Sequence, residues 1–474
     1  MKILFAASEC APFIKSGGLG DVAAALPKAL AKEKNTEVSV FLPYYQKIKN
    51  DPSVKVEFLR YIYVKLAWRD CYCGIFRLKS RSRKLQYYFI DNEYYFKRGS
   101  MYGDLDDGER FAFFSKAVLE SAVELGLEPR IIHCNDWQTA LIPVLVKSDP
   151  ARYGQFRTVL TIHNIEYQGI AGSDFAKEVL GLDQGFAQML ELDGCTNFLK
   201  GGLVACDKIT TVSPTYSEEI LDEYFAHGLE KILNENRYKL CGILNGIDTE
   251  LFDPMTDENL PVNYGPDAPE GKAECKKKLQ EELGLDVRPD VPMIAIVSRL
   301  ASHKGIELIE TVIRDIAESD VQLVVLGTGE GKYEGMFSAL AGLYPNKISA
   351  NIAFSVSLAS RIYAGADFLL MPSKSEPCGL AQMIAMRYGT LPIVRETGGL
   401  RDTVYPVDPG ARTGRGVTFK SYNAYDMLDA VRRAAAIYYD RECFETVSRG
   451  DMSTDFSWKS SVIRYLEAYG SVSL

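Results

Sequence analysis

Short apolar runs recur along the whole chain, and each ends in polar residues or glycine before a segment whose apolar residues have helical spacing. This alternation is typical of strand–helix–strand units. The runs are apolar on both faces, as in parallel strands covered by helices, so we expect an α/β fold with Rossmann-like, doubly wound sheets. The expected strands are residues 2–8, 37–43, 131–136, 158–164, 208–213, 293–300, 321–327, 367–373 and 391–394.

Two such sheets fit the length of the chain, since 474 residues are more than one hydrophobic core usually organises. A turn signal at Asn245-Gly246 precedes a weakly patterned stretch, rich in Pro and Asp, that extends to about residue 292. We predict an N-terminal domain over residues 1–243, a C-terminal domain over 244–456 and a C-terminal helix over 457–474. Ligands of doubly wound sheets bind at the carboxyl ends of the strands, so we expect the two domains to face each other across a ligand-binding cleft.

Charge and composition exclude several classes of protein. The net charge is −9, from 54 basic and 63 acidic residues, so no general attraction to nucleic acid or to an anionic membrane is expected. The chain reaches Ser8-Glu9 too soon for a signal peptide and has no apolar run long enough to span a bilayer, which predicts a cytosolic protein. The ten cysteines are scattered and are expected to be reduced, and the basic stretch 79–84 is expected to be a solvated loop.

The first expected strand leads into a glycine-rich loop with the chemistry of an anion site. The loop reads Lys15-Ser16-Gly17-Gly18-Leu19-Gly20-Asp21-Val22 and runs into a helical pattern over residues 23–30. Glycines let the backbone approach a phosphate closely, a helix N-terminus offers unpaired N–H groups, and Lys15 adds positive charge. Gly-x-Gly-x-x-Gly and Gly-Lys-Ser/Thr are absent, which argues against a dehydrogenase or an ATPase. Phosphate binding and a tight structural turn are both consistent with these residues.

The second half of the chain carries charged residues after its expected strands. Arg299 and Lys304 follow one strand and stand five residues apart across a turn. Such a pair can clamp a diphosphate, because guanidinium binds phosphate oxygens bidentately and lysine adds a compact charge; two exposed basic residues at a helix start are the alternative. Glu376 follows the strand at 367–371 through a short loop, which places its carboxylate at the carboxyl end of that strand, facing the expected cleft.

These features belong to a longer ordered series of motifs. The others are His133-Cys134-Asn135-Asp136-Trp137, His163-Asn164-Ile165-Glu166-Tyr167-Gln168-Gly169, Thr211-Val212-Ser213-Pro214, Asn245-Gly246-Ile247-Asp248, Ser298-Arg299-Leu300 with Lys304-Gly305, Glu376-Pro377-Cys378-Gly379-Leu380 and Thr397-Gly398-Gly399-Leu400. With the N-terminal loop they resemble the bacterial glycogen synthase and plant starch synthase family over essentially the whole catalytic chain.

The resemblance implies a fold and a reaction. The family has two Rossmann-like domains in the GT-B arrangement, a C-terminal helix that crosses back to the N-terminal domain, and no metal or cofactor requirement. It implies transfer of glucose from ADP-glucose to the non-reducing end of an α-1,4-glucan with retention of configuration. No residue stands out as a nucleophile, so we expect front-face substitution. The location implied is the cytoplasm, or the plastid stroma for a plant-type enzyme, and the sequence makes no prediction of an oligomeric state.

The resemblance also implies site residues. It assigns catalytic roles to His163, Arg299, Lys304 and Glu376, with Glu376 and His163 at the donor glucose. Further contacts to sugar, phosphate, base or acceptor are expected from Lys15, Gly17, Gly18, Asp21, Asp136, Asn164, Asn245, Phe354, Cys378, Gly379, Leu380, Thr397 and Gly398. A helix cap is the alternative for Asp21, and core packing is the alternative for Phe354 beside the base. The Cys378 thiol is expected to pack rather than to attack.

Three positions depart from common patterns. Gln138 replaces a frequent His and Ala381 a frequent Thr, which weakens the assignment of contacts to sugar and phosphate near them. Ile384 stands where relatives of this fold often carry a second Glu, but synthases of this type generally lack it too. None of these changes removes a charge from the expected clamp.

One motif and several rival functions compete with this interpretation. Asp104-Leu105-Asp106 spells the metal-binding Asp-x-Asp of another transferase fold, but it lies in a loop-like stretch, so no metal site is predicted. The alternatives are a transferase that uses UDP-glucose, a phosphorylase that uses glucose 1-phosphate, and a non-catalytic glucan-binding scaffold. A nucleotide-binding oxidoreductase is the most distant of them. A diphosphate clamp argues against the scaffold, since a binding module has little use for one.

Overall fold

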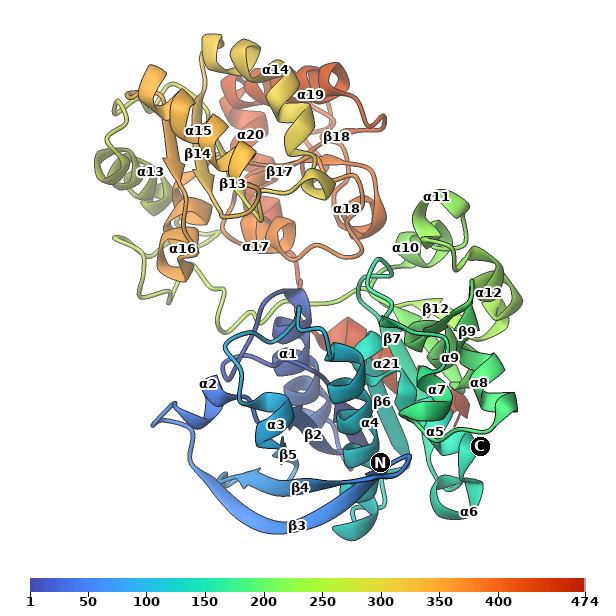
Figure 1. Ribbon diagram of the computed structural model, residues 1–474. Coiled ribbons are helices and arrows are strands. Elements are labelled where there is room, and N and C mark those ends of the chain that lie inside the picture. Colours follow the sequence, from blue (N-terminus) through green and yellow to red (C-terminus); the bar gives the residue numbers. More distant parts are fainter. Residues whose placement is uncertain (473–474) are drawn as a thin grey trace. The chain divides into compact units, whose positions relative to one another are not determined.

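The computed structural model describes residues 1–472. The chain divides into two compact units (Figure 1): unit 1 comprises Met1–Asn245 and the C-terminal segment from Trp458 onward, and unit 2 is Gly246–Ser457. The boundary thus lies two residues beyond the predicted end of the N-terminal domain at residue 243. Each unit is an α/β layer structure built on a largely parallel sheet.

Unit 1 is built on a nine-stranded sheet in the order β12-β11-β7-β6-β1-β2-β5-β4-β3. The strands are β1 (Lys2–Ala6), β2 (Glu37–Pro43), β3 (Val56–Leu66), β4 (Arg69–Leu78), β5 (Leu85–Asp91), β6 (Ile131–Asn135), β7 (Arg157–Ile162), β11 (Lys208–Thr211) and β12 (Leu240–Gly242). The predicted strands of this half are confirmed as β1, β2, β6, β7 and β11, which run parallel in the sheet. A separate small sheet contains β8 (Ile170–Ala171), β9 (Glu191–Leu192) and β10 (Cys195–Asn197).

Three strands, β3, β4 and β5, were not predicted from the sequence. β5 joins β2 in parallel, and β4 and β3 then continue the sheet in antiparallel fashion. β3 alternates between buried and exposed residues because only one of its faces is covered, by α4 (Asp107–Glu124). Such a strand lacks the continuous apolar run that marks the parallel strands. The basic stretch 79–84 connects β4 to β5 and is exposed, as predicted for a solvated loop.

Helices cover the sheet of unit 1. They are α1 (Gly18–Lys32), α2 (Gln46–Lys49), α3 (Glu93–Phe96), α4, α5 (Leu141–Ser148), α6 (Pro150–Tyr153), α7 (Phe175–Glu178), α8 (Gln184–Leu190), α9 (Phe198–Ala205), α10 (Pro214–Glu219), α11 (Glu223–Ala226), α12 (Glu230–Glu235) and α21 (Lys459–Val472). Residues 473 and 474 of the predicted C-terminal helix lie outside the described residues. α21 is tied to unit 1 by the Tyr469 hydroxyl, 2.8 Å from Nδ1 of His133, and by Ser461, whose hydroxyl donates to the Leu244 carbonyl.

Unit 2 is built on a six-stranded parallel sheet in the order β15-β14-β13-β16-β17-β18. Its strands are β13 (Met293–Val297), β14 (Gln322–Leu326), β15 (Ile348–Asn351), β16 (Phe368–Met371), β17 (Leu391–Arg395) and β18 (Val417–Phe419). β13, β14, β16 and β17 confirm the predicted strands. Its helices are α13 (Glu270–Leu283), α14 (Ile306–Glu318), α15 (Gly331–Leu343), α16 (Val356–Gly365), α17 (Ala381–Arg387), α18 (Gly398–Thr403), α19 (Ala424–Tyr439) and α20 (Arg441–Met452).

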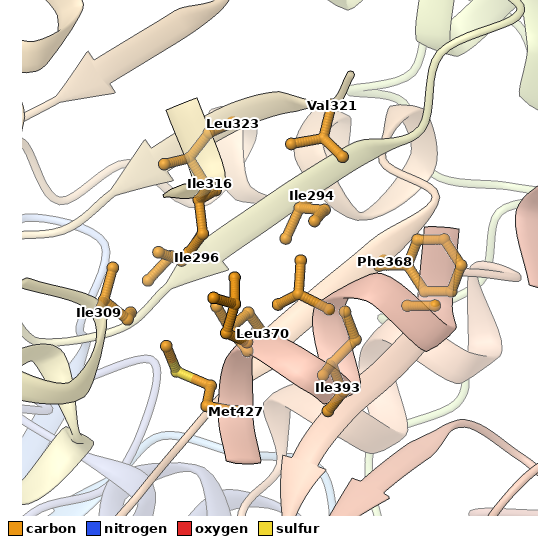
Figure 2. Close-up of a cluster of buried hydrophobic side chains, with 14 of the residues drawn as sticks. Ile294, Ile296, Ile309, Ile316, Val321, Leu323, Phe368, Leu370, Ile393 and Met427 are labelled. Atoms are coloured by element: carbon orange, nitrogen blue, oxygen red, sulfur yellow. The ribbon is translucent and has the colours of Figure 1, made fainter. Parts of the chain in front are cut away.

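The core of unit 2 lies between its sheet and the helices packed on it (Figure 2). Ile294 and Ile296 of β13 alternate with residues that point to the other face, as a strand requires. Ile309 and Ile316 of α14 and Met427 of α19 meet them from the helical layer. This packing fixes the central strands, whose carboxyl ends carry the charged residues described next. Among residues 1–472 there is no helix that combines the length and the apolar character needed to cross a bilayer.

Candidate active site

The glycine-rich loop of unit 1 is organised by Glu9, a buried residue that follows β1. Oε2 of Glu9 accepts hydrogen bonds from the backbone N–H of Ser16, at 2.5 Å, and from its hydroxyl, at 2.8 Å. Burial raises the pKa of the Glu9 carboxyl, while the hydrogen bonds from Ser16 and from the Gly20 backbone oppose that rise. Glu9 was not among the site residues predicted from the sequence. An acidic residue directly after the first strand and just before a glycine-rich loop was the available signal.

Lys15 and Asp21 form an ion pair across this loop. The Lys15 ammonium lies 2.7 and 2.8 Å from the two carboxylate oxygens of Asp21, and both side chains are about one-third exposed. The helix-cap alternative for Asp21 is wrong, because α1 begins at Gly18 with Gly17 at its N-cap position. The helix starts earlier than the apolar pattern at 23–30 indicated. A Cβ atom on Gly18 would meet nothing within 4 Å, so this glycine leaves open space in front of the helix N-terminus.

Asp136 follows β6 and holds the backbone of the loop after β7. Its Oδ1 accepts hydrogen bonds from the N–H groups of His163, at 2.7 Å, and Asn164, at 3.4 Å. Burial raises the pKa of the Asp136 carboxyl to about 7, against the effect of these two hydrogen bonds, and the nearby Glu9 carboxylate raises it further. Asp136 also has a φ of +55°, which is rare for a residue with a side chain. The structure therefore brings three predicted site residues together.

The ring of His163 has a defined tautomer. Its Nε2 lies 2.9 Å from Oδ1 of Asn135, whose amide nitrogen donates to the Ala6 carbonyl. Since Oδ1 of Asn135 is then an acceptor, Nε2 of His163 carries the hydrogen and Nδ1 has a free lone pair. Burial lowers the pKa of His163 to about 3, so the ring is neutral at physiological pH. Asn135 is a second positioning residue that the sequence analysis did not single out.

His133 in the same motif has a structural role. It is fully buried in β6, with Nε2 at 2.5 Å from the Thr161 hydroxyl and Nδ1 at 2.8 Å from the Tyr469 hydroxyl of α21. The His133 ring thus anchors α21, whereas Asp136, which follows the strand, holds the loop that carries His163. Asn245 lies at the end of unit 1, and its buried Oδ1 has no hydrogen-bond partner within residues 1–472.

The charged centre of unit 2 is a buried pair formed by Lys304 and Glu376. The Lys304 ammonium lies 2.9 Å from Oε1 and 2.7 Å from Oε2 of Glu376, and Ser373 donates its hydroxyl to Oε2 at 2.9 Å. The side chains are only 19% and 9% exposed. Burial alone would raise the pKa of Glu376, but the charge and hydrogen bonds of Lys304 and the hydrogen bond from Ser373 outweigh it and leave that pKa lowered.

Strand order explains why residues so far apart in sequence meet. Lys304 ends the turn after β13, Glu376 follows β16, and these two strands are parallel neighbours. Their carboxyl ends therefore lie at one edge of the sheet. The Lys374 N–H donates to the His303 carbonyl at 3.0 Å, which joins the two loops directly. Sequence placed Lys304 at a phosphate and Glu376 at a sugar, and did not predict that they contact each other.

Arg299 is exposed and less constrained than Lys304. Its Nη2 lies 3.4 Å from Nε2 of His303. The two predicted residues of the diphosphate clamp therefore differ: Lys304 is paired with a carboxylate, whereas Arg299 is exposed to solvent. A ligand phosphate could be reached by Arg299 without breaking an internal ion pair.

The loop after Glu376 packs against the turn that precedes α18. The Glu376 carbonyl accepts from the Gly399 N–H at 3.1 Å, and Thr397 occupies the N-cap position of α18 beside Gly398. Gly379 has a φ of +68°, and a Cβ there would lie 2.4 Å from Oε1 of Gln382. A glycine is therefore favoured here by the backbone conformation of the turn, independently of the predicted contact to the sugar.

The other predicted site residues of unit 2 differ in how far they are buried. Cys378 is buried, which fits a packing thiol, and Leu380 directly precedes α17. Phe354 lies in the loop after β15 and is 79% exposed, so the core-packing alternative is wrong. An exposed ring remains compatible with stacking on a base.

The Asp-x-Asp sequence of unit 1 is neutralised by arginines. Arg98 donates to Oδ2 of Asp106 at 2.6 Å, and its other terminal nitrogen lies 3.3 Å from Asp104. Arg110, which is fully buried, lies 3.5 Å from Asp104 and 2.8 Å from Asp107. Across residues 1–472 no three His, Cys, Asp or Glu side chains gather in a way that could hold a metal ion.

Comparison with known families accounts for both units. Residues 2–235 match the starch synthase catalytic domain family, and residues 280–444 match the glycosyl transferases group 1 family. The chain is 47% identical to a glycogen synthase of Exiguobacterium sibiricum over 478 aligned positions, which cover 99% of this chain and 98% of that protein. It is 45% identical to a glycogen synthase of Ligilactobacillus salivarius, with both chains fully covered.

The chain belongs to the glycogen synthase and starch synthase family. It is therefore a glycosyltransferase of glycogen or starch synthesis. The family expected from the motifs is confirmed.

Solved structures agree with the fold. The catalytic domain of starch synthase IV from Arabidopsis thaliana, bound to ADP and acarbose, matches with a TM-score of 0.91 and 34% identity, covering 100% of this chain and 99% of that one. A sucrose-phosphate synthase from Thermosynechococcus elongatus matches with a TM-score of 0.63 and 19% identity, over 99% and 98% of the two chains. The second likeness concerns the fold alone. Together they confirm the GT-B class with parallel sheets in two domains.

Proposed function

We propose that this synthase uses ADP-glucose as donor and adds glucose to the non-reducing end of an α-1,4-glucan with retention of configuration. The observation that carries the donor assignment is the Arabidopsis starch synthase bound to ADP and acarbose, which aligns with the whole of this chain. The chemistry of the loops is compatible with a nucleoside diphosphate, since each unit offers a lysine in a loop that follows a strand, Lys15 after β1 and Lys304 after β13. UDP-glucose is the alternative donor.

Each charged residue has a distinct part in the proposed reaction. Arg299 and Lys304 bind the diphosphate and stabilise the negative charge that develops as its bond to glucose breaks. Glu376 binds sugar hydroxyls, and its carboxylate favours positive charge at the anomeric carbon. Because Lys304 already contacts Glu376, a phosphate that approaches Lys304 shares its ammonium with the carboxylate and places the two charges on either side of the reacting bond.

The neutral ring of His163 acts as a hydrogen-bonding group rather than as a charge. Nε2–H is engaged by Asn135, so Nδ1 is the atom left to accept a hydrogen bond from a sugar hydroxyl. Asp136 fixes the backbone on which this ring is carried. In unit 1 the Lys15 loop, with its helix N-terminus at Gly18, binds phosphate oxygens.

The proposed chemistry is a front-face substitution. The bond from the anomeric carbon to the diphosphate breaks, the acceptor 4-hydroxyl forms the new bond on the same face, and its proton passes to a departing phosphate oxygen. We infer no cofactor and no metal, because arginine and lysine side chains supply the positive charge for the leaving group. We infer a cytoplasmic location, with the plastid stroma as the alternative for a plant-type enzyme.

The test is nucleoside diphosphate release by the purified protein. Glycogen is supplied with ADP-glucose or UDP-glucose, and acceptor-free reactions serve as controls. Acceptor-dependent ADP release with chain elongation is the expected result. UDP release at equal or greater kcat/KM would overturn the donor assignment, and no release with either donor from a folded protein would favour the glucan-binding scaffold. The anomeric configuration of the new linkage is read by NMR, and a β-linkage would exclude retention.

A further inference from the structure

The loop that connects β4 to β5 gathers positive charge around a cavity in unit 1. The cavity has a volume of about 650 Å³. Its lining includes Arg77 at the end of β4 and Lys79, Arg81 and Arg83 of the loop, and we call these four side chains the basic hollow. Such a concentration of positive charge runs against the composition of the chain, whose net charge is −9. Solvation explains why the loop is exposed, but not why its cations surround one cavity.

Three of these four cations lack an acidic partner. Glu57, which also lines the cavity, is bound by Arg77, whose Nε donates to Oε1 at 2.8 Å. Among residues 1–472, no carboxylate forms an ion pair with Lys79, Arg81 or Arg83. The chain is not short of acids, since it has 63 acidic residues against 54 basic ones. Because like charges repel, the stability of the fold does not account for this arrangement.

The loop is ordered by its own serines. The hydroxyl oxygen of Ser80 accepts from the Ser82 N–H, and that of Ser82 accepts from the Leu85 N–H, each at 3.1 Å. The side-chain amide of Gln86 donates to the Ser82 carbonyl, which ties the loop to β5. Both serines line the cavity, and within residues 1–472 neither hydroxyl donates its hydrogen to another residue. Two O–H donors therefore border the space that the cations surround.

The chemistry of the basic hollow fits a phosphate group. Guanidinium groups bind phosphate oxygens bidentately, lysine adds a compact charge, and hydroxyls can donate to the remaining oxygens. Within the described part of the chain, no aromatic ring lines the cavity, so a nucleobase or a sugar ring has nothing to stack on. The volume lies within the range of sites for small molecules, about 300–1,000 Å³. The ligand class indicated is a small phosphate-bearing anion.

The basic hollow lies at the opposite edge of the sheet from the Lys15 loop. β5 is parallel to β2, and β2 is parallel to β1. Loop 79–84 precedes β5, whereas the Lys15 loop follows β1, so the two loops lie at opposite ends of parallel strands. The Lys84 ammonium donates to the Glu33 carbonyl at 3.1 Å, at the C-terminal end of α1. The length of α1, roughly 22 Å, thus separates this contact from the Lys15 loop.

We propose that the basic hollow is a binding site for a small phosphate-bearing anion, separate from the site of glucose transfer. The cations and the two serine hydroxyls bind the phosphate oxygens, and the ligand relieves the repulsion among the cations. This site goes beyond the proposed function, which uses phosphate contacts only at the Lys15 loop, Arg299 and Lys304. A ligand at this edge of the sheet does not compete with the sugar donor.

The experiment measures binding of inorganic pyrophosphate to the full chain by isothermal titration calorimetry, in excess ADP to occupy the site of glucose transfer. Arg81→Gln/Arg83→Gln is the test variant. Lys47→Gln/Lys231→Gln is the matched control, since it removes two charges from exposed lysines of unit 1 outside the loop. We expect pyrophosphate to bind the wild type and the control alike. Its Kd should rise by about tenfold or more in the test variant, because charge-assisted hydrogen bonds are lost.

Further titrations identify the source of the phosphate. Inorganic phosphate represents a free anion, and glucose 1-phosphate represents an ester. Binding of either one with the same dependence on Arg81 and Arg83 supports the proposal. Urea denaturation of the test variant should give the wild-type midpoint, since both replaced side chains are exposed.

Three results would overturn the proposal. The first is no binding of any of the three anions to the wild type, and the second is equally tight binding by the test variant, which would place the anion elsewhere. The third is an equal loss of affinity in the test and control variants, which would reflect net charge alone. Sedimentation with phosphatidylserine vesicles that depends on Arg81 and Arg83, without binding of the small anions, would assign the basic hollow to a membrane surface instead.

Discussion

Two lysine–carboxylate pairs occur among the predicted site residues, one in each unit, and they differ in burial. Lys15 and Asp21 are six positions apart, each about one-third exposed, and close a surface loop. Lys304 and Glu376 come from neighbouring strands and are largely buried, with Ser373 as a further donor. The ammonium–carboxylate distance is 2.7 Å in both.

The difference in burial implies different roles for the two ion pairs. An exposed pair contributes up to about 1 kcal/mol, so a ligand phosphate can displace Asp21 from Lys15 at little cost. A buried pair is expensive to break, because the charge left behind is desolvated. Lys304 and Glu376 are therefore expected to stay near each other through the reaction. We infer that the first pair governs binding and the second governs turnover.

The largest effect is expected from Lys304→Ala. Loss of a transition-state donor should lower kcat by about 100-fold, and the unpaired Glu376 carboxylate should lower the free energy of unfolding by about 3 kcal/mol. Urea denaturation and steady-state kinetics measure the two effects. The matched control is Lys304→Met/Glu376→Gln, which buries no unpaired charge. It should recover most of the stability but none of the turnover, and recovery of turnover would contradict the assignment.

A buried carboxylate with no lysine partner provides the next comparison. The folded-state pKa of Asp136, about 7, lies above that of an unfolded aspartate, about 3.9, so folding favours the protonated acid. Its stabilising contribution is complete below pH about 4 and is lost as the pH rises through about 7. Asp136→Asn should abolish this pH dependence, on the order of 4 kcal/mol, in urea denaturation between pH 4 and 8. Identical pH dependence in both proteins would show that Asp136 is not the group.

Ser373→Ala tests the third member of the buried centre. Removing its hydrogen bond to Glu376 should cost about 1.5 kcal/mol of stability, since a hydrogen bond to a charged group is lost. It should also raise the pKa of Glu376, because that bond stabilises the carboxylate. The acid limb of the kcat profile should then move to higher pH. A profile that keeps its position would separate Ser373 from the ionisation of Glu376.

The smallest effect on stability is expected from Lys15→Ala. The free energy of unfolding should change by less than about 1 kcal/mol, and the change should shrink further at high salt. KM for the donor should rise by about tenfold, as expected when one phosphate contact is lost. Asp21→Asn frees the lysine without removing it and should leave that KM unchanged or lower. An increase equal to that of Lys15→Ala would mean that Asp21 itself binds the donor.

The sequence predicted the parts of the fold that have the strongest patterns. Parallel strands such as β1 and β13 are buried on both faces, and their apolar runs were identified directly. β3 and β4 were missed because one face is exposed and carries tyrosines, so aromatic residues occur where the pattern calls for polar ones.

The candidate site was predictable as a set of residues and not as a set of contacts. Motif spacing located Lys304 and Glu376 but carried no information that two residues 72 positions apart would touch. Glu9 and Asn135 escaped because each acts on another residue and neither stands out by residue type. Helix onset was also misjudged at Asp21, since glycines at the start of α1 weaken the apolar pattern there.

The most direct test of the division between the two pairs is to measure kcat and donor KM for Lys304→Ala and Lys15→Ala side by side, with saturating glycogen. We predict that Lys304→Ala loses about 100-fold in kcat, whereas Lys15→Ala keeps kcat within about threefold and raises KM. Near-wild-type turnover in Lys304→Ala, or an equal loss of kcat in both variants, would contradict the assignment of turnover to the buried pair.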